Sequence, residues 1–126
     1  MEKCVIILED DPDLAHLVRE LLTGEGYSAF VTGDADQLLA EAAVRAPCVA
    51  LVDSMNPAEY DMWWVGPKLA QLGVPPVAFT AHASARTQFE ADRHDFLAII
   101  EKPFDAQEFL DVVNSICWED YSRAVS

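Results

Sequence analysis

The stretch that decides the fold runs from Cys4 to Gly26 and reads CVIILEDDPDLAHLVRELLTGEG. Its first five residues are continuously apolar, which is typical of a parallel strand covered on both faces. The acidic run 9–11 follows at once, and Asp11 and Pro12 suit the N-cap and the first turn of a helix. Leucine and valine then recur every three or four residues. The stretch therefore predicts a strand, an acidic turn and an amphipathic helix, which is the first unit of an α/β fold.

The same alternation repeats along the rest of the chain. Further strands are expected at 27–31, 49–52, 77–79 and 96–99, and further helices at 34–45, 61–72, 84–93 and from 105 onward. Gly66 and Pro67 interrupt the third helix, so it should kink or begin late, because proline removes a donor and clashes with the preceding turn. Strands that bury both faces need helices on both sides. The pattern predicts a flavodoxin-like (βα)5 three-layer sandwich with right-handed crossovers.

Length and charge restrict the function further. The 126 residues fit one domain, 1–126, with a core over about 3–121, and we expect no output domain. Eight basic against 22 acidic residues give a formal charge of −14, which repels nucleic-acid phosphates and anionic lipids. The first apolar run is too short for a signal peptide or a membrane span. We therefore expect no nucleic-acid partner and no membrane partner.

The cysteines give no sign of a redox or metal motif. Cys4, Cys48 and Cys117 are too far apart in the sequence for a CxxC pair or a zinc knuckle. Three is also an odd number for a disulfide framework. All three lie on apolar elements, which favours buried thiols over a redox sensor. This usage predicts a reducing, cytoplasmic location.

Polar groups stand where the predicted strands end: Asp10 and Asp11, then Asp53, Thr80 and Lys102. The carboxyl ends of parallel strands meet at one edge of the sheet, so these groups should form one site. Three carboxylates cannot stay close and ionised without a cation, and oxygen ligands suit Mg²⁺. If Asp53 attacked a phosphoryl group, the cation and the Lys102 ammonium would neutralise the transferring oxygens. The site therefore predicts Mg²⁺-assisted phosphoryl transfer to a carboxylate.

Each of these residues also has a plainer interpretation. The acidic run 9–11 could be only a solvated turn and a helix cap, and Asp53 could cap the following loop. Thr80 could satisfy backbone groups at a strand end, and Lys102 could be a surface cation. Their occurrence at successive strand ends favours a shared site.

Four motifs resemble the receiver domain of two-component response regulators, in order and across nearly the whole chain: LEDD at 8–11, LVDSMNP at 51–57, FTA at 79–81 and EKPF at 101–104. The resemblance implies a CheY-like, single-domain response regulator with sheet order 2-1-3-4-5. It implies a phosphorelay phosphoprotein that takes its phosphoryl group from a histidine kinase or a histidine phosphotransfer protein. Phosphorylation would then change a surface that binds a downstream protein.

The resemblance also implies roles for the site residues. Asp53 would be the phosphoacceptor, and Asp11 and Asp53 would bind Mg²⁺ directly, with Asp10 acting through water and Met55 through its backbone carbonyl. Lys102 would contact the phosphoryl group, and the Lys102–Pro103 bond would be cis. Such a protein is a phosphoacceptor and not a classical enzyme. Mg²⁺-dependent self-phosphorylation from small donors and autodephosphorylation stay open.

The switch elements follow the family in part. Thr80 resembles the switch hydroxyl, and Ala81 leaves space and an adjacent amide beside the phosphoryl group. Met55 and His82 stand at positions that tune the lifetime of the acyl phosphate. Ile99 departs from the family, because receivers commonly carry tyrosine or phenylalanine there. This departure puts the coupling of phosphorylation to output in doubt.

Three alternatives stay open at this point. The chain could be a phosphate sink, which drains a kinase by the same chemistry. It could be a receiver-like adaptor that signals without phosphorylation, which Ile99 favours. It could also be a phosphohydrolase of the haloacid dehalogenase type, although Met55 stands where those enzymes place a second acid.

Overall fold

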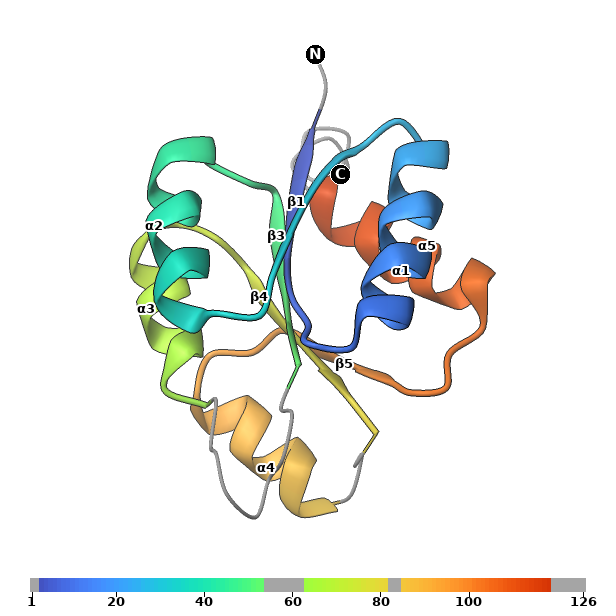
Figure 1. Cartoon of the computed structure of the whole chain (residues 1–126). Coiled ribbons are helices and arrows are strands. Elements are labelled where there is room, and N and C mark those ends of the chain that lie inside the picture. Colours follow the sequence, from blue (N-terminus) through green and yellow to red (C-terminus); the bar gives the residue numbers. More distant parts are fainter. Residues whose placement is uncertain (1–2, 54–62, 82–84, 119–126) are drawn as a thin grey trace.

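The computed structural model describes residues 3–53, 63–81 and 85–118. The strands are β1 (Cys4–Leu8), β2 (Ser28–Thr32), β3 (Val49–Asp53), β4 (Pro76–Thr80) and β5 (Ala98–Glu101). The helices are α1 (Pro12–Gly24), α2 (Ala35–Arg45), α3 (Val65–Gln71), α4 (Ala85–Arg93) and α5 (Ala106–Cys117). All strand pairs are parallel, in the order β2-β1-β3-β4-β5 (Figure 1). The predicted flavodoxin-like fold is confirmed.

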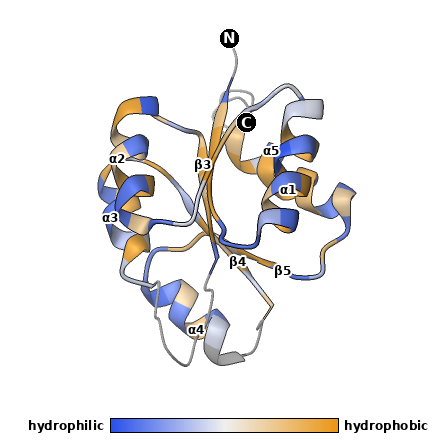
Figure 2. Cartoon of the chain, in the orientation of Figure 1, coloured by the Kyte–Doolittle hydropathy of each residue, from blue (hydrophilic) through white to orange (hydrophobic). Residues whose placement is uncertain are grey.

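The sheet is the middle of three layers. Helices α1 and α5 cover one face, and α2 and α3 cover the other, with α4 below them (Figure 1). Apolar residues are concentrated along the strands (Figure 2), and they form one hydrophobic cluster on each face of the sheet. The α1/α5 cluster contains Phe79 and Phe109, and the α2/α3 cluster contains Leu38 and Leu69. Two separate cores fix the sheet, and with it the positions of the strand ends.

Aspartate side chains begin three of the helices. Asp11, Asp34 and Asp105 are the N-caps of α1, α2 and α5, and each accepts hydrogen bonds from two backbone amides of the first turn. Such caps satisfy donors that have no partner within the helix, and each contributes about 1 kcal/mol. The sequence-based starts of these helices are therefore correct to within one residue.

Helix α3 begins late, as the glycine-proline pair predicts. It starts at Val65, so Pro67 lies in the first turn, where no backbone donor is needed. Gly66 allows the helix to approach the connection between α4 and β5. A Cβ atom at Gly66 would lie 2.3 Å from the carbonyl oxygen of His94 and 2.5 Å from the ring of Phe96.

Strand β5 begins at Ala98, two residues later than the sequence predicts. The amide of Phe96 donates to the carbonyl oxygen of Ala91 at 3.0 Å, so Phe96 closes the end of α4. Its ring is buried in the α2/α3 cluster. The apolar character of Phe96 therefore reflects core packing between elements and not strand pairing.

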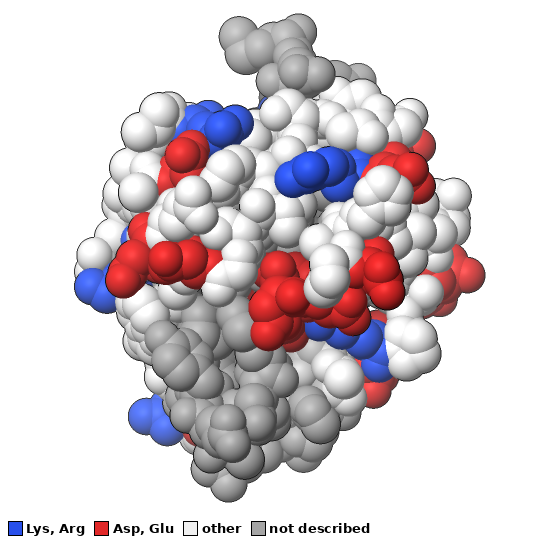
Figure 3. Space-filling view, in the orientation of Figure 1, with Lys and Arg blue, Asp and Glu red and all other residues white. Residues whose placement is uncertain are grey.

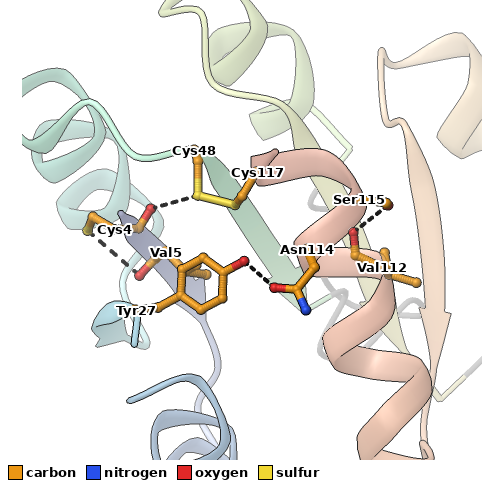
Figure 4. Close-up of a disulfide and its surroundings, with 8 residues drawn as sticks. All are labelled: Cys4, Val5, Tyr27, Cys48, Val112, Asn114, Ser115 and Cys117. Carbon is orange, nitrogen blue, oxygen red and sulfur yellow. Dashed lines mark hydrogen bonds between the residues drawn. A yellow bond between two sulfur atoms is a disulfide. The ribbon is translucent and has the colours of Figure 1, made fainter. Parts of the chain in front are cut away.

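The prediction of three free, buried thiols is wrong. Cys48, directly before β3, forms a disulfide with Cys117 at the end of α5, and the two Cα atoms are 5.0 Å apart (Figure 4). The two residues are 69 positions apart in the sequence but meet at the amino ends of the strands. Only Cys4 stays a free thiol. Sequence spacing did not indicate this pair, because the two cysteines are distant in the sequence and become neighbours only in the folded chain.

None of the helices in the described ranges is long and apolar enough to cross a membrane.

Candidate functional site

The site lies at the carboxyl ends of four strands, at the edge opposite the disulfide. Glu9 and Asp10 follow β1, Asp53 is the last residue of β3, and Lys102 follows β5 directly. Thr80 ends β4. Because β1, β3, β4 and β5 are consecutive parallel strands of the sheet, their carboxyl ends lie at the same edge (Figure 1).

Three carboxylates come close together at this edge. Oxygen atoms of Glu9, Asp10 and Asp53 all lie within 4.8 Å of one another. Glu9 and Asp53 are 4% and 5% exposed, whereas Asp10 is open to solvent. Figure 3 shows acidic side chains gathered in the middle of this face, with a basic group beside them. A set of converging oxygens with one side open fits a hard divalent cation such as Mg²⁺.

The ammonium of Lys102 bridges two of the carboxylates. Its Nζ atom donates to Oε1 of Glu9 at 2.7 Å and to Oδ1 of Asp53 at 2.9 Å. It also lies 4.7 Å from the centre of the buried Phe79 ring, which is a cation–π contact. The Lys102–Pro103 bond is cis, as the resemblance implies. The Lys102 ammonium is therefore held by Glu9, Asp53 and the Phe79 ring, and it directly contacts Asp53, the candidate phosphoacceptor.

Burial and charge act in opposite directions at this site. Burial raises the pKa of Glu9, and so does the charge of Asp53, while hydrogen bonds from Lys102 and from the Asp11 amide act to lower it; the net direction is upward. Burial lowers the pKa of Lys102, but the hydrogen bonds to Glu9 and Asp53 outweigh this effect and raise it. The raised pKa of Lys102 favours its charged form. The raised pKa of Glu9 shows that burial makes its negative charge unfavourable unless a positive group lies nearby.

Asp11 does not join the carboxylate group. Its Oδ1 atom accepts hydrogen bonds from the amides of Asp13 at 3.0 Å and Leu14 at 3.5 Å, which cap α1. The sequence-based ligand set placed Asp11 in direct contact with the metal and left out Glu9. The structure instead brings Glu9 together with Asp10 and Asp53. The signal for Glu9 was its place directly after the last residue of β1.

Of the remaining predicted site residues, the structure describes Thr80, Ala81 and Ile99. Thr80 is 1% exposed, and its carbonyl oxygen accepts the Lys102 amide at 2.8 Å. Ala81 follows it and is exposed. Ile99 pairs with Ala78 in the sheet and packs against the α2/α3 cluster. The predictions for Met55 and His82 lie outside the described residues.

Comparison with known proteins assigns the family. A family model described as the response regulator receiver domain matches residues 5–114. The nitrogen assimilation regulatory protein NtrX of Azorhizobium caulinodans is 32% identical over 117 residues, which cover 84% of this chain and 24% of that protein. The chain therefore spans about a quarter of the length of this relative.

Solved structures show the same fold. A CheY-like receiver domain protein from Methanospirillum hungatei has a TM-score of 0.86 at 22% identity, covering 98% of this chain and 99% of that one. The receiver domain of sensor histidine kinase PA1611 from Pseudomonas aeruginosa has a TM-score of 0.80 at 20% identity, covering 93% and 98%, and contains a magnesium ion in its active site cleft. The chain belongs to the response regulator receiver domains of two-component systems, a family of phosphoacceptors that work with kinases and are not classical enzymes.

Proposed function

We propose that Asp53 accepts a phosphoryl group from a phosphohistidine donor, on a histidine kinase or a histidine phosphotransfer protein. The observation that carries this proposal is the position of the Asp53 carboxylate. One of its oxygens is 2.9 Å from the Lys102 ammonium, and Glu9 and Asp10 lie within 4.8 Å. Placement and charge are most of what a protein contributes to phosphoryl transfer.

We propose Mg²⁺ as the cofactor, held by oxygens of Glu9, Asp10 and Asp53. The donor set supports this choice, because three carboxylates against one ammonium leave an excess of negative charge that a divalent cation would neutralise. Mg²⁺, when bound, supplies positive charge beside the oxygens of the transferring group.

The residues of the chain then have distinct tasks. An Asp53 oxygen forms a bond to phosphorus while the bond from phosphorus to the donor nitrogen breaks. The electron pair of that bond stays on the imidazole, which then takes up a proton from solvent. Lys102 already contacts Asp53, and its ammonium would stabilise the negative charge on the phosphoryl oxygens. Glu9 orients the ammonium from the other side.

The phosphorylated form would signal through a changed binding surface. The acyl phosphate adds negative charge at a buried point next to the end of β4, where Thr80 and Ala81 lie. We propose that the Thr80 hydroxyl responds to this charge and that a downstream protein in the cytoplasm reads the change. Self-phosphorylation from small donors and autodephosphorylation would follow from the same site.

Labelling tests the proposal. The full chain should gain one phosphoryl group from acetyl phosphate only when Mg²⁺ is present, as measured by intact mass spectrometry. Asp53→Asn should abolish the label, and Lys102→Ala should slow its appearance, whereas Asp111→Asn on the exposed surface of α5 serves as the matched control. A label that survives Asp53→Asn would refute the assignment.

A second candidate is a receiver-like adaptor that does not use phosphorylation as its signal. The observation that favours it is Ile99, whose aliphatic side chain packs into the α2/α3 cluster where other receivers carry an aromatic ring. Without the ring, a movement of Thr80 has no aromatic partner to displace. Phosphorylation could then occur without an altered surface.

Amide NMR spectra separate the two candidates. Beryllofluoride with Mg²⁺ mimics an acyl phosphate, and a coupled switch should shift the amide signals of Thr80 and of α4. Shifts confined to the neighbours of Asp53 would support the adaptor. Shifts that reach α4 would exclude it.

A further inference from the structure

The structure carries a second chemical site at the end of the sheet opposite Asp53. The disulfide between Cys48 and Cys117 joins the residue before β3 to the last residue of α5 (Figure 4). Cys48 is half-buried, whereas Cys117 is 4% exposed and packs in the α1/α5 cluster. Cys48 is therefore the more exposed residue of the pair, and Cys117 is the more buried one.

The third cysteine is close by but faces the other way. The amide of Cys48, directly before β3, donates to the carbonyl oxygen of Cys4 at 2.9 Å, so Cys48 lies beside the first residue of β1. The Cys4 side chain packs against the α2/α3 cluster, whereas the disulfide belongs to the α1/α5 side. Figure 4 shows the Cys4 sulfur directed away from the disulfide. The fold thus places the disulfide between Cys48 and Cys117 on one face of the sheet and the free thiol of Cys4 on the other.

The surroundings accommodate both the disulfide and the two thiols. Cys48 Sγ lies 3.4 Å from the carbonyl oxygen of Cys4. When Cys48 is reduced, its thiol can donate a hydrogen bond to this oxygen, whereas a disulfide sulfur has no hydrogen to donate. The end of α5 is also held without the disulfide, because Tyr27 donates to the Asn114 side chain and Lys3 lies 4.6 Å over the Trp118 ring. Neither of these contacts involves the two sulfur atoms, so both can persist when the disulfide opens.

We propose that Cys48 and Cys117 form a reversible redox modification site whose oxidant is a small disulfide such as glutathione disulfide. The Cys48 thiolate attacks one sulfur of glutathione disulfide, and one glutathione leaves and takes up the proton that Cys48 lost. The Cys117 thiolate then attacks the Cys48 sulfur and expels the second glutathione in the same way. Two protein thiols are oxidised, and one glutathione disulfide is reduced to two thiols. In a reducing compartment the pair would close only when oxidised glutathione accumulates.

The experiment uses the full chain with Cys4→Ser, which removes the thiol that is not part of the disulfide. The reduced, folded protein is equilibrated in glutathione buffers of graded redox ratio, without denaturant. Acid quenching, alkylation and intact mass then count the free thiols. We expect two thiols to disappear together as the buffer becomes more oxidising and to return when it becomes reducing. Thiols that stay alkylatable at every ratio, or a disulfide that the most reducing buffer does not open, would overturn the proposal.

Single variants in the same background test the order of attack. Cys117→Ser should accumulate a mixed disulfide with glutathione at Cys48, because Cys48 is the more exposed of the two residues. Cys48→Ser should accumulate far less at the buried Cys117. Equal modification of both variants would contradict the assigned roles. Asp53 lies at the opposite edge, so a failure here would leave the proposed phosphoacceptor function untouched.

Discussion

Glu9 and Asp11 are two residues apart, yet the structure gives them different tasks. The Glu9 carboxylate is buried and bonded to Lys102, and the Asp11 carboxylate is exposed and bonded to the first turn of α1. The difference arises because β1 ends and α1 begins within this run. Glu9 is buried like the strand residues before it, whereas Asp11 has the extended backbone of an N-cap.

Substitution at these two positions should separate metal binding from helix stability. Glu9→Gln should weaken Mg²⁺ binding on the order of tenfold, because affinity follows the number of charged ligands. Asp11→Ala should leave Mg²⁺ binding nearly unchanged and lower the free energy of unfolding by about 1 kcal/mol through loss of the cap. Calorimetric Mg²⁺ titration and urea unfolding measure the two effects. The reverse pattern would restore Asp11 as the ligand.

At the scale of elements, α3 depends on a close approach that only glycine permits. Val65 and Leu69 bury one side of the helix, and Gly66 brings its backbone against the segment that links α4 to β5. Trp63 packs on the same segment, with its ring 5.3 Å from that of Phe96 in an edge-to-face contact. Trp63 is half-buried and packs against the α2/α3 cluster.

Gly66→Ala should therefore destabilise the fold. The added methyl would overlap the carbonyl oxygen of His94, a backbone atom that cannot move aside, and overpacking of this kind costs about 1–3 kcal/mol. Gly24→Ala is the matched control, because a Cβ atom there meets nothing within 4 Å and the expected change is below about 1 kcal/mol. Chemical denaturation of both variants checks the difference. Equal stability of the two would contradict the close approach.

At the scale of the whole molecule, the two ends of the sheet carry different chemistry. The carboxyl ends gather the acids and Lys102, and the amino ends hold the disulfide. The disulfide closes a loop that contains every element from β3 to α5. It therefore restricts the unfolded chain over more than half of its length.

Reduction should lower global stability without loss of the fold. A disulfide across a loop of this size contributes about 2–4 kcal/mol, mainly through the entropy of the unfolded chain. Urea unfolding with and without a reductant should show this difference in the Cys4→Ser protein and none in Cys48→Ser. A difference that persists in Cys48→Ser would show that the reductant acts elsewhere.

Local patterns were sufficient for most of the fold, and long-range contacts account for the rest. The apolar run at 49–52 and the caps Asp34 and Asp105 are short-range signals, so the elements they mark were predictable. The Cys48–Cys117 pair was not, because only the finished fold places these residues together. Within the acidic run, local sequence could not decide which carboxylate points into the site. That choice depends on where β1 ends relative to α1.

A crystal structure of the full chain with Mg²⁺ and beryllofluoride tests the central claim most directly. The predicted result has beryllium on an Asp53 oxygen, Mg²⁺ among the oxygens of Glu9, Asp10 and Asp53, and the Lys102 ammonium on the fluorides. Beryllofluoride bound elsewhere, or a magnesium ion coordinated away from Asp53, would contradict it.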